Sequence, residues 1–250
     1  MTTELLDAEH RRITRAKQVQ PIKRIAIPRH DAIKGQLSAA FQAVIDGKAE
    51  AQEIPPDDWR SKFEANERMR RVQFLFSKSN APRRQLELIS PDRSGEWGRV
   101  ESRMIKKLGS GFLIALIGVR GCGKTQLAVE LMRLETKRLR EARYVTALEF
   151  FLKLRASYRK NASASEAEVL DDYATPSLLV IDEIARRGET DFENNFLFGL
   201  IDRRYRDVSD TIIISNQERA EFCTSIGPSL SSRMQETGGI IECAWQSYRE

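Results

Sequence analysis

The 250-residue sequence has little cysteine, and it has no hydrophobic run long enough to span a membrane. Its three cysteines, Cys122, Cys223 and Cys243, form no C-x-x-C pair and leave an odd count, which argues against a disulfide framework and a zinc site. The longest apolar run, Phe112–Ile117, is far shorter than the ~20 residues of a membrane helix. The amino terminus is acidic before it becomes basic, so it lacks the order of a secretory signal. We therefore expect a cytoplasmic protein that does not enter a membrane.

Charge is distributed unevenly along the chain. Residues 1–110 carry 22 Lys and Arg against 15 Asp and Glu, whereas residues 111–250 carry 19 against 21. A basic first half indicates an anionic partner, either a nucleic acid or an acidic protein surface. A merely solvated basic surface remains the alternative, because charge alone specifies no geometry.

Two amphipathic helices are predicted in the first part of the chain. Apolar residues recur at helical spacing over Asp31–Ile45, and Gly47 follows as a stop signal. After Pro55-Pro56 a strongly basic helix is predicted, with its apolar residues roughly on one side: Trp59, Phe63, Val72 and Phe76. Turn-forming residues then dominate up to Gly98, so we place a domain boundary near residue 85. This predicts a helical, partner-binding domain at residues 1–85 and a second domain at residues 86–250.

Short apolar strands alternate with helices in the second domain. Strands are predicted at Phe112–Ile117, Tyr144–Thr146, Leu178–Ile181, Thr211–Ile214 and Ile240–Cys243. Helices are predicted at Val100–Leu108, Lys124–Arg140, Leu148–Arg159 and Phe192–Tyr205. This alternation is typical of an α/β fold in which helices cover both faces of a parallel sheet.

A glycine-rich loop between the first of these strands and the next helix matches G-x-x-x-x-G-K-[ST] at every fixed position. Glycines let the backbone wrap a phosphate, so that main-chain N–H groups and the positive end of the following helix face the anion. The lysine then reaches the β- and γ-phosphates of ATP, and the threonine hydroxyl is a Mg²⁺ ligand. The predicted ATP-binding residues are Gly118, Val119, Arg120, Gly121, Cys122, Gly123, Lys124 and Thr125.

Polar side chains follow two of the other strands. Asp182 and Glu183 come directly after Leu178–Ile181, and open α/β sheets place ligand chemistry at the carboxyl ends of their strands. Asp182 is predicted to hold the Mg²⁺ shell together with Thr125, and Glu183 to polarise the attacking water. The strand Thr211–Ile214 is followed by Ser215 and then Asn216. An amide at this place can hydrogen-bond both the attacking water and the γ-phosphate. The alternative is that Asn216 only forms a turn.

Together with these motifs, the later segments Gly227–Met234 and Trp245–Arg249 make the chain resemble a DnaC-type AAA+ helicase loader. The resemblance runs from about Arg68 to the carboxyl terminus and assigns residues 86–250 to an AAA+ P-loop ATPase core with a five-stranded parallel sheet. Because the chain ends soon after this motif, we expect no C-terminal helical lid and no second sensor arginine.

The resemblance also implies roles for individual residues. Asn216 becomes the sensor that positions water, and Arg233 becomes an arginine finger that reaches the ATP of a neighbouring subunit in a self-associated state. A helical insertion before the acidic strand contacts single-stranded DNA in this family. It corresponds here to Lys153, Arg155, Tyr158 and Arg159, where cations beside an aromatic ring suit backbone neutralisation and base stacking. Packing of Tyr158 into the core remains the alternative.

Three functions are compatible with the phosphate loop. The first is an ATP-dependent loader that binds single-stranded DNA and a hexameric replicative helicase, with residues 1–85 docking on the helicase. The second is an IstB-type transposition helper that assembles on duplex DNA and shares every ATP motif. The third is a small-molecule kinase, which has no evident need for the water sensor at Asn216 or for a finger at Arg233.

Overall fold

A computed structural model of the chain describes residues 58–87 and 94–245. The predicted helix Asp31–Ile45 lies outside the described residues, as does all but the first residue of the Trp245–Arg249 motif. The described residues from Trp59 to Trp245 belong to one compact unit. Within the described ranges, no helix is both long enough and apolar enough to cross a membrane.

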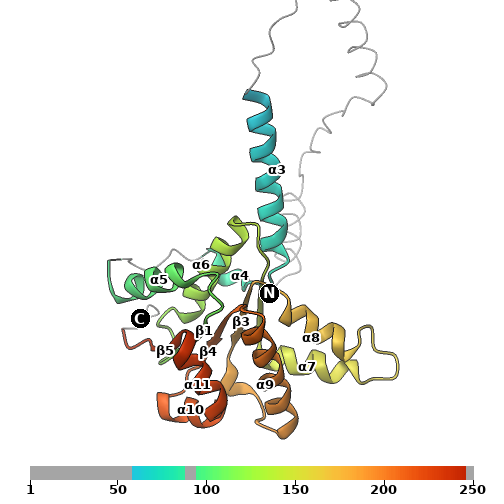
Figure 1. Ribbon diagram of the computed structural model, residues 1–250, viewed down its shortest axis with the longest axis vertical. Helices are drawn as coiled ribbons and strands as arrows, with labels where there is room; N and C mark the ends of the chain where they lie inside the picture. Colours follow the sequence, from blue (N-terminus) through green and yellow to red (C-terminus); the bar gives the residue numbers. More distant parts are fainter. Residues whose placement is uncertain (1–57, 88–93, 246–250) are drawn as a thin grey trace, which may run out of the picture. The chain divides into compact units, whose positions relative to one another are not determined.

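The centre of this unit is a five-stranded sheet in which every pair of neighbouring strands is parallel. Its strands lie in the order β2-β3-β4-β1-β5, which confirms the predicted parallel α/β fold (Figure 1). All five residues of β1, β3 and β4 are buried, and this explains why these strands are nearly continuous apolar runs. The strand bounds are β1 Leu113–Ile117, β2 Ala142–Thr146, β3 Leu178–Asp182, β4 Asp210–Ile214 and β5 Gly239–Glu242.

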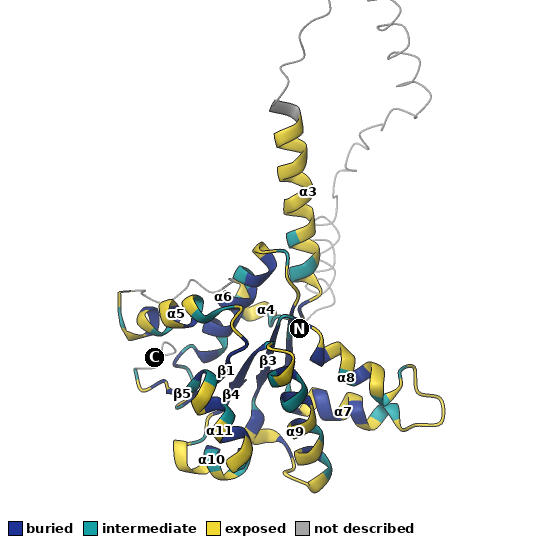
Figure 2. Ribbon diagram, viewed as in Figure 1, coloured by how far each residue is buried: buried dark blue, intermediate teal, exposed yellow. Residues whose placement is uncertain are grey.

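Helices cover the two faces of the sheet, and alternate residues of β1 point into two separate cores. Leu113, Ala115 and Ile117 pack with α7, α8, α9, α10 and α11, whereas Ile114 and Leu116 pack with α5 and α6. Figure 2 shows the sheet buried between these layers and the outer helix faces exposed. The helix bounds are α5 Glu96–Lys107, α6 Lys124–Lys137, α7 Ala147–Ser157, α8 Glu166–Ala174, α9 Asp191–Arg206, α10 Arg219–Ile226 and α11 Pro228–Thr237.

Four helices of the unit were not predicted from the sequence: α4 (Arg83–Glu87), α8, α10 and α11. The α8 helix is short and acidic and buries only Val169, Tyr173 and Ala174, so its apolar stripe is too brief to be periodic. The α10 and α11 helices are separated by Gly227, whose φ of +83° ends the first, and Pro228 then opens the second.

The predicted basic helix is α3, Asp58–Ser77, and a short helix, α4 at Arg83–Glu87, follows it. Most α3 side chains are exposed, including Phe63 at 58%, so only the last part of its apolar side is covered (Figure 2). Phe76 packs against the core beside α6, and Tyr144 donates a backbone hydrogen bond to Ser79 O at 2.7 Å. The segment after α3 is therefore attached to the β2 edge of the sheet. The functional boundary near residue 85 stays a prediction.

Candidate functional site

The phosphate loop leaves β1 at Gly118 and enters α6 at Lys124. Gly118, Gly121 and Gly123 all have positive φ values, of +126°, +91° and +84°. At Gly118 a β-carbon would also lie 2.7 Å from the carbonyl oxygen of Cys243. Glycine is required there because the backbone has a positive φ and also lies close to the backbone of Cys243, directly after β5.

Hydrogen bonds from outside the loop hold its backbone in place. Lys124 Nζ donates to the carbonyl oxygens of Gly118 and Val119, each at 2.7 Å. Trp97 Nε1 of α5 donates to Gly123 O at 3.3 Å, and Trp245 Nε1 donates to Cys122 O at 2.6 Å. The loop is thus supported by two tryptophans, neither of which lines the cavity. Sequence reasoning missed the role of Trp97, since nothing local marks a contact 26 residues along the chain.

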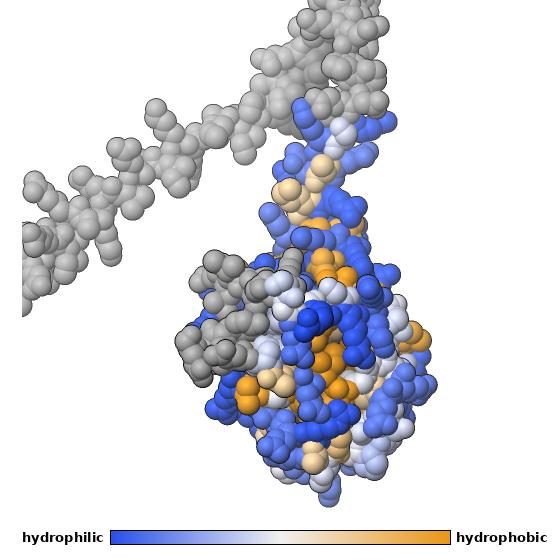
Figure 3. Space-filling model, turned by 90° about the vertical axis from the view of Figure 1, so that its left-hand side faces the viewer, coloured by the Kyte–Doolittle hydropathy of each residue, from blue (hydrophilic) through white to orange (hydrophobic). Residues whose placement is uncertain are grey.

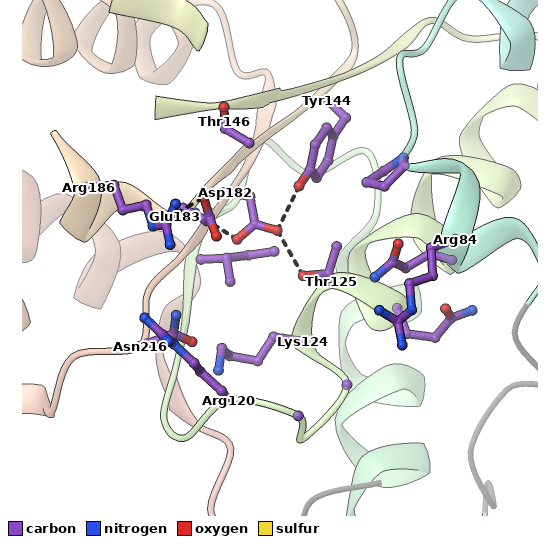
Figure 4. A pocket seen from close by; sticks show the side chains of 16 residues that line it. Arg84, Arg120, Lys124, Thr125, Tyr144, Thr146, Asp182, Glu183, Arg186 and Asn216 are labelled. Atoms are coloured by element: carbon purple, nitrogen blue, oxygen red, sulfur yellow. Dashed lines mark hydrogen bonds and ion pairs between the residues drawn. The ribbon is translucent and has the colours of Figure 1, made fainter. Parts of the chain in front are cut away.

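Two predicted Mg²⁺ ligands meet at the end of β3. Thr125 Oγ1 donates to Asp182 Oδ2 at 2.8 Å, and the backbone N–H of Glu183 donates to Asp182 Oδ1 at 2.7 Å (Figure 4). Asp182 is 6% exposed, so its carboxylate is held almost completely inside the protein. The threonine oxygen and the carboxylate therefore lie close enough to share one cation shell.

Tyr144 of β2 is a third group at this carboxylate, and the sequence did not reveal it. Its hydroxyl donates to Asp182 Oδ2 at 2.9 Å (Figure 4). Burial raises the pKa of the Tyr144 hydroxyl, and the negative charge of Asp182 raises it further. Tyr144 therefore stays protonated at neutral pH and remains a hydrogen-bond donor to the carboxylate.

Glu183 and Asn216 face the same cavity from the ends of neighbouring strands, β3 and β4 (Figure 4). Glu183 has a φ of +54°, which is uncommon for a residue with a side chain. Its carboxylate lies 3.5 Å from Arg186 Nε and is 39% exposed. This conformation turns the chain directly after Asp182.

The cavity has a volume of about 800 Å³ and brings together the residues predicted from separate motifs. Lys124, Thr125, Asp182, Glu183 and Asn216 all line it. Arg84, Arg120 and Arg186 line it as well, which provides cations for an anionic ligand (Figure 4). Arg84 comes from α4 and was not predicted as a site residue.

The donor set fits Mg²⁺ carried into the cavity with a nucleotide. Among residues 58–87 and 94–245, no three His, Cys, Asp or Glu side chains are grouped as a metal site. Mg²⁺ in nucleotide sites is typically held by one or two protein oxygens together with phosphates and water. Thr125 and Asp182 match that pattern, because they provide one hydroxyl and one carboxylate.

The structure places Arg233 away from this cavity. Its guanidinium donates to Asp202 Oδ1 at 2.5 Å and to Ser229 Oγ at 2.9 Å. It also lies over the rings of Phe198 and Tyr205, at 5.1 and 5.4 Å from the ring centres. Arg233 does not line the cavity of its own chain. Its predicted role as a finger toward a neighbouring subunit stays a prediction.

The four predicted DNA-binding residues lie on α7 and on the turn that leads to α8. Lys153 Nζ donates to Tyr173 OH at 2.8 Å, and Arg155 forms an ion pair with Glu193 at 2.7 Å, so both cations have partners within the unit. Tyr158 is 56% exposed and its hydroxyl donates to Glu166, and the side chain of Arg159 is exposed. Tyr158 therefore lies at the surface.

Comparisons with known proteins agree with this site and fold. A family model described as IstB-like ATP binding protein matches residues 100–236. The replicative helicase loader DnaC of Escherichia coli K12 is 27% identical over 133 residues, which are 53% of this chain and 54% of that protein. The chain thus aligns with about half the length of this curated relative.

Solved structures show the same architecture at low sequence identity. The crystal structure of the DnaC helicase loader aligns with a TM-score of 0.51 and 18% identity, over 67% of this chain and 97% of that one. AMPPCP-bound DnaA from Aquifex aeolicus aligns with a TM-score of 0.52 and 20% identity, over 63% of this chain and 49% of that one. Together these matches confirm the AAA+ P-loop ATPase fold.

Proposed function

We propose, since the chain belongs to the family of IstB-like ATP binding proteins, that it hydrolyses ATP and uses the reaction as a switch in loading a hexameric replicative helicase onto DNA. The observation that carries the proposal is the convergence of the phosphate loop, Asp182, Glu183 and Asn216 on one cavity. The similarity to a replicative helicase loader supports the loading role.

In the proposed ATP reaction, the loop N–H groups and the start of α6 bind the phosphates. Lys124 exchanges its contacts with Gly118 O and Val119 O for the β- and γ-phosphates. Thr125 and Asp182 would hold Mg²⁺, which would supply neutralisation of the charge that develops on the phosphates. Apart from Lys124, which must leave its two carbonyl partners, these groups already line one cavity, and this keeps the reorganisation small.

Glu183 is proposed to orient the attacking water and accept its proton. Its partly exposed carboxylate faces the cavity beside Asn216, whose amide is proposed to hold the water and the γ-phosphate. Arg233 of a neighbouring subunit is proposed to stabilise the charge from outside, so that hydrolysis depends on self-association. Such a finger increases the rate by about 10³- to 10⁵-fold in other nucleotide hydrolases.

The proposed nucleic-acid ligand is single-stranded DNA at the turn between α7 and α8. The exposed ring of Tyr158 offers a stacking surface, and Arg159 beside it offers a charge for the backbone. Docking on the helicase is proposed for residues 1–85, whose larger part lies outside the described residues.

An IstB-type transposition helper that acts on duplex DNA is the second candidate. The description of the matching family favours it, and the ATP site is common to both functions. The two candidates differ in the partner that the chain must bind.

A capture experiment with purified partners separates the two candidates. The full-length chain, with ATP and Mg²⁺, is mixed with a hexameric helicase or with a transposase encoded in the same genome, and complexes are resolved by size exclusion. A complex with the helicase that stimulates its binding to single-stranded DNA is expected. A complex with the transposase alone would contradict the loading role, and absence of ATP hydrolysis in every mixture would contradict the ATPase.

A further inference from the structure

The exposed side of α5 carries a row of basic residues that no part of the ATP site uses. Arg99, Arg103 and Lys106 are exposed and, together with Ser102, line a shallow groove of about 500 Å³. Their spacing of four and three residues places them on one side of the helix, over about 10 Å of its axis. The opposite side of α5 is buried through Trp97 and Met104. The row is therefore fixed in position by the core beneath it.

These cations are not used in ion pairs within the part of the chain that the structure describes. Arg99, Arg103 and Lys106 form no salt bridge with any residue of 58–87 or 94–245, whereas seven of the fourteen other exposed arginines in these ranges have a carboxylate partner. Glu96 lies one turn before Arg99 at the start of the helix and is unpaired with it. An uncompensated row of three cations raises the local positive potential and attracts anions.

We propose that this row on α5 binds the phosphate backbone of a nucleic acid strand, at a site separate from the turn between α7 and α8. The proposal deepens the proposed function, because it assigns a second contact for the same class of ligand. An acidic protein is a poorer fit, since protein interfaces usually have an apolar centre. The residues of α5 that are exposed from Arg99 to Lys106 are all polar, and in Figure 3 hydrophilic residues border a central hydrophobic strip on this side of the unit.

The position of α5 connects this surface to the ATP site. Trp97, at the amino-terminal end of the helix, donates to Gly123 O in the phosphate loop at 3.3 Å. Lys107, at the other end, donates to Thr237 O of α11, the helix that carries Arg233. In Figure 1, α5 lies on the side of the sheet away from α7 and α8. A nucleic acid strand bound on α5 would therefore contact a helix that is hydrogen-bonded both to the phosphate loop and to α11.

The test measures binding of fluorescein-labelled oligothymidine and of a labelled duplex by anisotropy across a salt series. The variant Arg99→Ala/Arg103→Ala/Lys106→Ala is compared with the wild type in the full-length chain. Loss of three phosphate contacts should lower the slope of log K against log salt by about 2 on the single strand or about 3 on the duplex. Affinity at low salt should fall by about tenfold or more. Which probe shows the loss identifies the form of nucleic acid.

A control variant removes the same charge elsewhere: Lys137→Ala/Arg206→Ala/Arg219→Ala, all exposed and none on α5. It should keep a slope closer to that of the wild type, and a thermal melt should show that both triple variants are folded. Equal slopes for the two triple variants would overturn the proposal. Unlabelled DNA and polyglutamate are then compared as competitors of the labelled probe. Equal competition by the two would overturn the proposal as well, because the α5 row would then select negative charge alone.

The variant Tyr158→Ala/Arg159→Ala shows whether a negative result contradicts the α5 proposal or the DNA contact of the proposed function. If this variant loses single-stranded DNA while the α5 variant does not, the α5 proposal is wrong and the DNA contact of the proposed function stands. If the wild type binds neither probe, both assignments of a nucleic acid fail. Loss in the α5 variant alone would support the α5 row and contradict the contact at Tyr158.

Discussion

Replacing Tyr144 with Phe tests whether the proposed Mg²⁺ site at Asp182 is organised in advance by its neighbours. The substitution removes the hydroxyl that donates to Asp182 Oδ2 and keeps the ring that packs in the core beside α6. Asp182 would retain the donors from Thr125 Oγ1 and from the backbone of Glu183. Its carboxylate should therefore stay in place on average but lose one of three restraints.

The size of the effect follows from the charge on the acceptor. A hydrogen bond to a charged group contributes about 1.5–3 kcal/mol, and the two remaining donors favour the lower end of that range. A change of about 1.4 kcal/mol is tenfold in an equilibrium constant. We expect Tyr144→Phe to raise the Mg²⁺ concentration for half-maximal binding of a fluorescent ATP analogue by up to about tenfold, the value reached if the whole contribution comes from positioning Asp182 for the cation. Binding in EDTA should change little, because the Tyr144 hydroxyl donates to Asp182 and not to the phosphate loop.

Tyr173→Phe is the matched control. It also removes a buried hydroxyl, which accepts from Lys153 at 2.8 Å, but it lies outside the cavity. Its Mg²⁺ dependence should equal that of the wild type. If Tyr144→Phe kept the wild-type Mg²⁺ midpoint, or lost binding equally in EDTA, the positioning role of Tyr144 would be refuted.

Three further predictions concern separate parts of the molecule. Glu183→Gln should bind ATP normally and hydrolyse it at least about 100-fold more slowly, because it loses the proposed base; wild-type turnover would show a wrong assignment. Tyr158→Ala/Arg159→Ala should weaken single-stranded DNA binding by about tenfold through loss of stacking, with an unchanged melting temperature. An unchanged affinity would show that this turn does not bind the DNA. A chain starting at Asp58 should keep its fold and its ATP binding, since Ser79 and Phe76 remain on the sheet, but it should lose the helicase. Retained capture would place docking within residues 58–250 and contradict a role for residues 1–57.

The start of that truncation differs from the predicted boundary near residue 85 for a structural reason. Cutting at residue 85 would remove Ser79, which is fully buried, and would leave the backbone N–H of Tyr144 without its acceptor. An unsatisfied buried backbone group costs about 1–3 kcal/mol. The longer chain avoids that cost and makes loss of partner binding easier to interpret.

Much of the site was predictable because its residues are adjacent in the sequence. The phosphate loop is one motif of eight positions, and the acidic pair directly follows an apolar strand. Parallel strands end at the same edge of a sheet, so the meeting of Thr125 with Asp182 followed once β1, β3 and β4 were identified. The sheet was equally predictable, since its central strands are buried at every position.

Other parts depend on contacts between distant segments, which local patterns do not encode. Tyr144 was visible only as one residue of a strand, yet it reaches a carboxylate 38 positions away. Arg84 reaches the cavity from α4, on a segment that composition assigned to a different domain. The apolar spacing of α3 predicted the helix correctly, but the spacing did not show that Phe63 would be exposed. In each case the missing information is the packing partner.

The assignment of Arg233 is the prediction that most depends on assembly. In the single chain its guanidinium is paired with Asp202 and is 23% exposed, so a finger role requires that this contact be exchanged for a phosphate of another subunit. Arg233→Ala should therefore leave ATP binding by the isolated chain intact and reduce hydrolysis in the assembled state by about 10³-fold or more. A reduction already present in the monomer would indicate a local role instead.

Mixing two inactive variants decides whether Arg233 acts between subunits. Lys124→Ala lacks the phosphate-binding cation but keeps its arginine, while Arg233→Ala keeps an intact cavity. At an interface where the first chain supplies the arginine and the second supplies the cavity, every group is present, so part of the hydrolysis should return. A mixture of Lys124→Ala with Glu183→Gln is the control, because both changes damage the cavity and no interface regains it. Recovery in neither mixture, or equal recovery in both, would contradict an arginine finger at Arg233.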